Sequence, residues 1–142
     1  MIMKYQHVLC LYPYYKEPVF LDFFPPAGIE HIATALESYV GEITLVDLRR
    51  EQEYHDLSQL AQFCQQHVDL MCVSVNWPFY FDQVCNLLNG LPDNIPLIVG
   101  GRQATDRLEE LFQRCPHLNI IVRGEGEETI RIASVESRFS NF

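Results

Sequence analysis

Basic residues and long apolar runs are both scarce in this chain of 142 residues. Ten Lys and Arg stand against nineteen Asp and Glu, which gives a formal net charge of −9 at pH 7. A surface of that sign repels the phosphates of nucleic acids and of anionic membranes. No run approaches the roughly 20 apolar residues of a membrane span, and the N-terminus lacks the pattern of a signal peptide. We therefore expect a cytoplasmic protein with no nucleic-acid partner and no membrane partner.

Cysteines at metal-binding spacing are lacking as well. The five cysteines each fall on the apolar face of an expected strand or helix, so we expect buried, reduced thiols and no metal ligands. Neither G-x-G-x-x-G nor G-x-x-x-x-G-K-S/T follows the first apolar run, which disfavours the common dinucleotide and P-loop sites. No serine lies in a G-x-S-x-G elbow, which disfavours a serine hydrolase.

The chain does contain a regular alternation of short apolar runs with segments of helical period. The apolar runs are residues 8–12, 43–47, 71–75, 97–100 and 120–123. Each segment between them offers one apolar stripe to a sheet. The alternation predicts an α/β fold: a Rossmann-like, five-stranded parallel sheet in the flavodoxin-like order 2-1-3-4-5, with helices on both faces.

Turn and capping signals agree with this division of the chain. Asp56 with Gln59, and Asp106 with Glu109, have the spacing of a capping box at a helix start. We expect one domain over residues 6–134. Residues 135–142 are expected to be a tail, or the start of a C-terminal region that the sequence does not include.

Aromatic residues gather behind the first and third apolar runs. Ten of the seventeen aromatic residues (nine Phe, seven Tyr and one Trp) lie within residues 12–24 and 77–81. In the order 2-1-3-4-5 those two strands are neighbours whose connections leave to opposite faces. The crevice at such a point is where open α/β sheets bind ligands. The sequence therefore predicts a ligand-binding edge that the two aromatic stretches share.

The other strand ends add polar groups and glycines to this edge. The third run ends in a serine and an asparagine, and the fourth in two glycines that allow bare backbone to approach a ligand. The fifth is followed by two glycines and by carboxylates, which argue against a phosphate there. The third end could alternatively be a capped turn before Pro78, and the fourth a tight turn. The expected ligand contacts are Tyr12, Pro13, Tyr14, Ser74, Val75, Asn76, Trp77, Gly100, Gly101, Arg102, Gln103, Gly124, Glu125 and Gly126.

Two other polar groups are interpreted as structural. Asp47 ends the second apolar run, and without a glycine fingerprint we take it as a turn residue before the Arg49-Arg50 pair, not as a ribose acceptor. Residues 51–56 contain two glutamates, a histidine and an aspartate, which we interpret as a solvated connection and not as a metal site.

Four segments in order resemble the N-terminal cobalamin-binding domain of radical S-adenosylmethionine enzymes. They are PPAGI at 25–29, VDL at 46–48, VGGRQAT at 99–105 and RGEGEET at 123–129. The resemblance covers about residues 7–133. It implies a domain that holds cobalamin at the C-terminal strand edge, with the nucleotide tail in the crevice. By this resemblance Ser74, Gly100 and Gly101 correspond to positions that line the tail.

Two departures from the family pattern qualify this resemblance. The D-x-H-x-x-G signature, whose histidine coordinates cobalt in many cobalamin domains, is absent, and His31 is expected to be a packing or surface residue. We therefore expect no histidine ligand to cobalt. The C-x-x-x-C-x-x-C motif is also absent, so an iron-sulfur cluster and S-adenosylmethionine would belong to a catalytic domain outside this sequence, in cis or in trans.

The chain by itself is accordingly expected to contribute no catalytic residues to a methyltransferase or related radical enzyme. A second hypothesis stays open beside the cobalamin domain. In it the same apolar edge docks a protein partner, and the cofactor site is degenerate.

Overall fold

A computed structural model describes residues 4–16 and 26–124 of the chain. Five strands form one parallel sheet: β1 (His7–Tyr12), β2 (Glu42–Asp47), β3 (Leu70–Ser74), β4 (Leu97–Gly100) and β5 (Ile120–Ile121). Their spatial order is β2-β1-β3-β4-β5, and every neighbouring pair is parallel. The predicted fold class and strand order are therefore confirmed.

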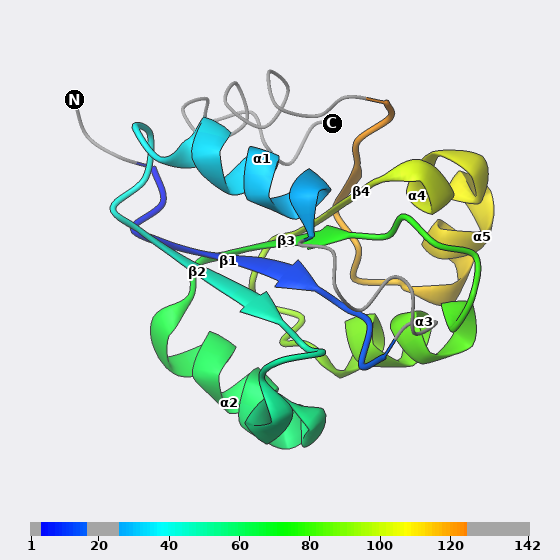
Figure 1. Cartoon of the computed structure of the whole chain (residues 1–142), viewed down its shortest axis with the longest axis horizontal. Helices are drawn as coiled ribbons and strands as arrows, with labels where there is room; N and C mark the ends of the chain where they lie inside the picture. The colour runs from blue at the N-terminus through cyan, green and yellow to red at the C-terminus, as the bar shows by residue number, and fades with distance from the viewer. Residues whose placement is uncertain (1–3, 17–25, 125–142) are drawn as a thin grey trace.

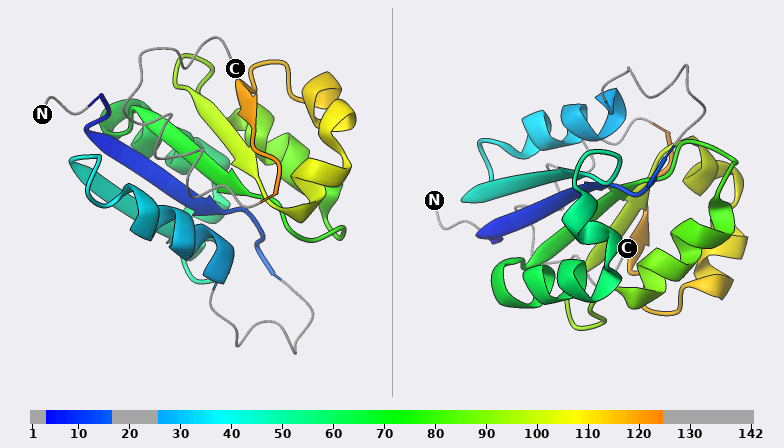
Figure 2. Two further views of the ribbon diagram at one scale, coloured as in Figure 1. Left: turned by 90° about the horizontal axis from the view of Figure 1, so that it is seen from above. Right: turned by 60° about the horizontal axis from the view of Figure 1, so that its bottom comes forward.

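Helices cover both faces of the sheet (Figures 1 and 2). One face carries α1 (Ala27–Leu36), and the opposite face carries α2 (Leu57–His67) and α3 (Phe81–Gly90). The 3-10 helix η2 (Gln52–His55) precedes α2, while α4 (Arg102–Asp106) and α5 (Leu108–Arg114) connect β4 to β5. None of the helices in the described ranges is long and apolar enough to span a bilayer. The expected tail at 135–142 lies outside the described residues.

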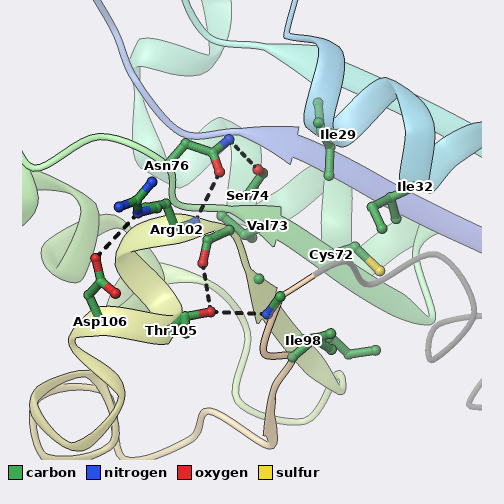
Figure 3. Close-up of a pocket in the computed structure, with 15 residues that line it drawn as sticks. Ile29, Ile32, Cys72, Val73, Ser74, Asn76, Ile98, Arg102, Thr105 and Asp106 are labelled. Atoms are coloured by element: carbon green, nitrogen blue, oxygen red, sulfur yellow. Dashed lines mark hydrogen bonds and ion pairs between the residues drawn. The ribbon is translucent and has the colours of Figure 1, made fainter.

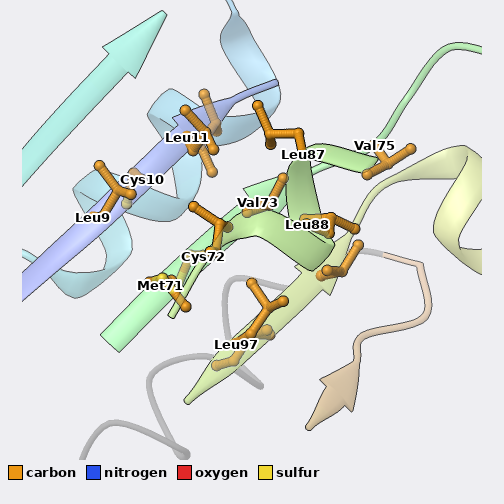
Figure 4. Packing of buried hydrophobic residues seen from close by; sticks show 14 of the residues in the cluster. Leu9, Cys10, Leu11, Met71, Cys72, Val73, Val75, Leu87, Leu88 and Leu97 are labelled. Carbon is orange, nitrogen blue, oxygen red and sulfur yellow. The ribbon is translucent and has the colours of Figure 1, made fainter. Parts of the chain in front are cut away.

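The core lies on both faces of the two central strands, β1 and β3 (Figure 4). All five residues of β3 are buried, as are the last five of β1. Continuous burial of this kind is expected for central strands of a parallel sheet, which helices cover on both sides. The edge strand β2 is buried only at its last two residues, next to the strand end. The best-packed part of the sheet therefore ends at the C-terminal edge of β1 and β3.

The cysteines are part of this core. All five are free and buried, as the sequence predicts. Burial raises the pKa of the Cys64 and Cys115 thiols to about 12. A hydrogen bond with Cys10, its register partner on β1, and burial hold the pKa of Cys72 well above its ordinary value. These thiols therefore stay protonated at neutral pH and serve as small apolar residues.

The two expected capping boxes have different outcomes. Asp56 is the N-cap of α2, and its carboxylate accepts a hydrogen bond from the Ser58 backbone N–H at 3.0 Å. The second prediction is wrong, because Asp106 ends α4 and the N-cap of α5 is Arg107. The short helix α4 takes up the residues that the sequence assigns to a turn, and this shifts the start of the next helix.

Candidate functional site

A cavity of about 440 Å3 lies at the C-terminal ends of β3 and β4 (Figure 3). It is on the face of the sheet that carries α1, and α4 borders its outer end. Its volume falls in the range of about 300–1,000 Å3 that is usual for small-molecule sites. The lining residues are Gly28, Ile29, Ile32, Cys72, Val73, Ser74, Asn76, Ile98, Gly100, Gly101, Arg102, Thr105, Asp106, Val122 and Gly124.

The inner part of the cavity is apolar. Cys72 on β3, Ile98 on β4 and Val122 after β5 face it, and Ile29 and Ile32 of α1 face them across the space. The three sheet residues are each buried, with 3% to 7% of their surface exposed. Cys72, Ile98 and Val122 each lie two residues before a rim residue, namely Ser74, Gly100 and Gly124. Residues two apart on a strand share a face, so Cys72 and Ile98 are on the same face as Ser74 and Gly100.

The outer rim is polar, and its side chains hold one another in place. The Asn76 amide Nδ2 donates to Ser74 Oγ at 2.8 Å, and the backbone N–H of Arg102 donates to Asn76 Oδ1 at 3.2 Å. Ser74 is one of the two buried polar residues among those described, with 7% of its surface exposed. Asn76 thus connects the end of β3 to the start of α4, and both ends of its amide are used.

Thr105 connects the other side of the rim. Its hydroxyl donates to the Gly101 carbonyl at 3.3 Å and accepts from the Gly124 backbone N–H at 3.2 Å. The Arg102 guanidinium lies outside this network, because its side chain is 82% exposed and pairs with Asp106 at 3.7 Å. The rim therefore consists of the segments after β3, β4 and β5, which the Asn76 amide and the Thr105 hydroxyl connect by hydrogen bonds.

The two glycines after β4 have different structural roles. Gly101 has φ of +102°, and a Cβ there would lie 2.5 Å from Asn76 Oδ1 and 2.6 Å from the Val75 carbonyl oxygen. Only glycine fits this position without displacing the backbone. At Gly100 a Cβ would meet only Val122, at 3.9 Å, which is ordinary contact. The absence of a side chain at Gly100 therefore leaves cavity space that the fold itself does not require.

The described aromatic residues of the two stretches converge at the ends of β1 and β3, but they pack on one another, whereas Phe20, Phe23 and Phe24 lie outside the described residues. The Tyr14 hydroxyl donates to the Trp77 carbonyl at 3.1 Å and accepts from the Trp77 backbone N–H at 3.0 Å. The Trp77 indole N–H donates to the Tyr12 hydroxyl at 2.8 Å. Burial raises the pKa of Tyr14 to about 12, and its side chain is 1% exposed. Their polar atoms are therefore satisfied within the cluster.

The loop after Trp77 is held in a strained conformation. Trp77 stacks on Phe79 with ring centroids 5.8 Å apart and planes at 8°, and Phe79 meets Tyr80 edge to face at 5.4 Å. Tyr80 has φ of +60° at the start of α3, a left-handed conformation that is costly for an aromatic residue.

The structure separates the sequence-predicted site residues into three groups. Six of them line the cavity together: Ser74, Asn76, Gly100, Gly101, Arg102 and Gly124. Six others do not line it: Tyr12, Pro13, Tyr14, Val75, Trp77 and Gln103. The last two, Glu125 and Gly126, lie outside the described residues. Val75 is buried, and its carbonyl accepts from the Gln103 N–H at 2.9 Å, so this pair joins β3 to α4.

Sequence reasoning missed the apolar wall of the cavity. The lining residues outside the predicted set are Gly28, Ile29, Ile32, Cys72, Val73, Ile98, Thr105, Asp106 and Val122. The alternation along β3 and β4 carries the signal, because Cys72 and Ile98 must share a face with Ser74 and Gly100. The position of α1 over that face decides that these side chains border a cavity.

The polar groups that the sequence interprets as structural have the following surroundings. The Asp47 carboxylate accepts from the Arg49 guanidinium at 2.7 Å and from the Arg49 backbone N–H at 3.0 Å, and the two side chains are 12% and 5% exposed. Both of its oxygens accept hydrogen bonds from Arg49. His31 is exposed on α1. Within the described ranges, no group of three or more His, Cys, Asp or Glu is arranged to hold a metal ion.

Known proteins were compared with this chain at the level of sequence and of fold. No protein-family profile matches it. An uncharacterized methyltransferase of Pyrococcus horikoshii is 22% identical over 110 residues, which are 75% of this chain and 23% of that protein. The solved structure of TsrM, a radical S-adenosylmethionine methyltransferase of Kitasatospora setae, has tryptophan substrate and a SAM analogue bound. It is similar over 96% of this chain and 26% of its own, with a TM-score of 0.71 and 19% sequence identity.

These comparisons support part of what the sequence predicts. The likeness to TsrM shows a shared Rossmann-like fold, and both relatives are methyltransferases. The chain spans about a quarter of the length of each protein. It is therefore similar to a domain-sized part of larger methyltransferases.

Proposed function

We propose that this chain is a cobalamin-binding domain of a radical S-adenosylmethionine methyltransferase or related enzyme. In this proposal it holds the corrinoid at the C-terminal strand edge without a histidine ligand to cobalt. One observation carries the proposal: the cavity at the ends of β3 and β4 has an apolar interior, a polar rim and a bare backbone at Gly100. The four segments that resemble the cobalamin-binding family and the fold shared with TsrM agree with it.

The described residues fit the nucleotide tail of cobalamin. The tail ends in a flat, largely apolar ring system, and the cavity offers an apolar interior of suitable size. A Cβ at Gly100 would make only ordinary contact with Val122, at 3.9 Å, and a Cβ at Gly124 would meet nothing within 4 Å. Ser74, Asn76 and Thr105 would border the polar part of the tail. When bound, cobalamin supplies the chemistry of methyl transfer, and this chain supplies its position.

The chain would position cobalamin by offering it a rigid rim. Ser74 accepts a hydrogen bond from Asn76, which leaves the Ser74 hydroxyl hydrogen without an acceptor among the described residues and available to a ligand. Asn76 and Thr105 hold the rim segments after three strands in fixed relation. A preformed rim of this kind reduces the entropy lost on binding.

A catalytic domain outside this sequence would complete the enzyme. The chain spans about a quarter of each methyltransferase it matches, which leaves room in those proteins for further domains. None of its described residues forms a cluster that could hold a metal. We assign the iron-sulfur cluster and S-adenosylmethionine to that partner, whether it is joined in cis or acts in trans.

The second candidate function is a protein-interaction module, and the aromatic residues favour it. Trp77, Phe79 and Tyr80 are only partly buried, and they stack on one another at the strand edge instead of lining the cavity. A rigid, partly exposed aromatic surface of this type is typical of a binding interface. In this alternative the cavity would hold no corrinoid.

A size series at Gly100 tests the proposed site. Hydroxocobalamin is titrated into the wild-type chain and into Gly100→Ala and Gly100→Leu, and the absorbance change gives the dissociation constant. We expect little change for alanine and at least about a tenfold loss for leucine, whose side chain would fill the cavity. Glu109→Leu, on an exposed position of α5, is the matched control. Equal affinity of all four proteins would place the ligand elsewhere.

A further inference from the structure

The cavity changes polarity along its depth, from the rim inward. Ser74, Asn76 and Thr105 are at the C-terminal ends of the strands, whereas Cys72 and Ile98 lie one strand repeat deeper. Ile29 and Ile32 of α1 close the inner part from the other side. A ligand that enters from the rim therefore passes polar groups first and ends among apolar ones.

The inner wall also offers few polar groups to a ligand. Cys72 and Ile98 are register partners in the β3–β4 ladder, so their strands use their backbone groups on each other. The Val122 N–H donates to the Val99 carbonyl at 2.9 Å. The Cys72 thiol, beside its register partner Cys10 on β1, is only a weak hydrogen-bonding group. In the part of the chain that the structure describes, a polar atom placed deep in the cavity would therefore meet apolar side chains and one weakly polar sulfur.

From this polarity we infer that the cavity selects the terminal base of the corrinoid. The inference rests on the proposed function and goes beyond it. The site accepts 5,6-dimethylbenzimidazole, which carries two methyl groups, and discriminates against adenine, which carries an amino group and additional ring nitrogens. Burying those groups without hydrogen bonds costs free energy that the apolar base does not lose. A wholly apolar pocket discriminates by roughly tenfold to a hundredfold between ligands of similar shape.

Three corrinoids separate this inference from the proposed function. The wild-type chain is titrated with cobalamin, with the cobamide that carries adenine in place of dimethylbenzimidazole, and with cobinamide, which lacks the nucleotide tail. We expect cobalamin to bind at least about tenfold more tightly than the adenine form. We also expect cobinamide to bind more weakly than cobalamin, because its missing tail leaves the cavity empty.

The outcomes that overturn the two claims differ. Equal affinity for the two bases, with weaker binding of cobinamide, overturns the selectivity and leaves the proposed function standing. Equal affinity for all three corrinoids shows that the tail stays outside the cavity and overturns the selectivity. Binding of none of them overturns the proposed function and the selectivity together.

Two threonine variants test the physical cause. Val122→Thr nearly keeps the side-chain volume and replaces one methyl group of the wall by a hydroxyl. We expect the ratio of the two dissociation constants to fall severalfold toward equality. Ile121→Thr places the same hydroxyl, on a shortened side chain, at the neighbouring residue, which does not line the cavity, and is the control. An unchanged ratio in Val122→Thr, with both variants folded by circular dichroism, would overturn the assignment of selectivity to this wall.

Discussion

Gly100 and Gly101 are adjacent in the sequence, but the backbone requires glycine only at the second of them. A Cβ at Gly101 would collide with the Val75 carbonyl and with Asn76 Oδ1, and φ of +102° is unfavourable for any other residue. A Cβ at Gly100 makes only ordinary contact with Val122. Resemblance alone treats the two positions as equivalent, whereas the geometry assigns Gly101 to folding and Gly100 to the cavity.

We therefore expect Gly101→Ala to destabilise the fold and Gly100→Ala to leave it nearly unchanged. The loss at Gly101 should be about 1–3 kcal/mol, the cost of a strained backbone conformation together with a displaced neighbour. Urea denaturation of the two variants, followed by circular dichroism, measures the difference. Equal free energies of unfolding would mean that the turn after β4 adapts to a side chain.

Tyr14 is a second residue whose role differs from the sequence-based expectation. Its hydroxyl bonds both the N–H and the C=O of Trp77 and is 1% exposed. Tyr14→Phe would leave those two backbone groups without their partner, and we expect a loss of about 1–3 kcal/mol in unfolding free energy. Tyr15→Phe is the matched control, because the Tyr15 ring meets His55 edge to face and its hydroxyl has no hydrogen-bond partner among the described residues. A similar loss in both variants would contradict this interpretation.

At the scale of elements, the strands and their order can be predicted from the sequence, but the turn after β4, which borders the cavity, cannot. Buried apolar runs with right-handed crossovers leave few arrangements, and the order β2-β1-β3-β4-β5 is one of them. The five-residue helix α4 has no periodic pattern that could reveal it. It forms because the Val75 carbonyl accepts from the Gln103 N–H and Asn76 accepts from the Arg102 N–H, and both contacts depend on the neighbouring strand.

The start of α2 gives a prediction that depends on pH. The hydrogen bonds from Ser58 lower the pKa of the Asp56 carboxyl below its ordinary value of 3.8. The ionised cap therefore stabilises the fold fully above that ordinary value, and the contribution is lost as the pH falls through the lower, folded-state pKa. Asp56→Asn retains a capping side chain without the charge.

We expect the wild-type chain to melt at a higher temperature than Asp56→Asn at neutral pH, with the difference shrinking below pH 3.8. Thermal unfolding followed by circular dichroism across this range measures it. A difference that grows with acidity would show that the carboxylate is not the stabilising form of the cap.

At the scale of the whole molecule, the sequence locates the site edge but not the side of the sheet that holds the cavity. Ser74 and Gly100 could be assigned to the C-terminal edge because the strands that end there are parallel. The aromatic residues share that edge, and their abundance suggests a ligand seat. The Tyr14 hydroxyl bonds the Trp77 backbone, and the Trp77 indole bonds the Tyr12 hydroxyl, so these residues form a packed cluster beside the cavity. That outcome depends on three-dimensional pairing, which no spacing in the sequence encodes.

The central claim is that this chain binds cobalamin, and its most direct measurement is gel filtration of the purified chain after incubation with hydroxocobalamin. The account predicts that the colour of the corrinoid elutes with the protein. It also predicts an absorption spectrum that lacks the band of dimethylbenzimidazole-coordinated cobalt, because the base occupies the cavity and no histidine replaces it. Complete separation of the colour from the protein at high micromolar concentration would contradict the account and favour the protein-interaction module.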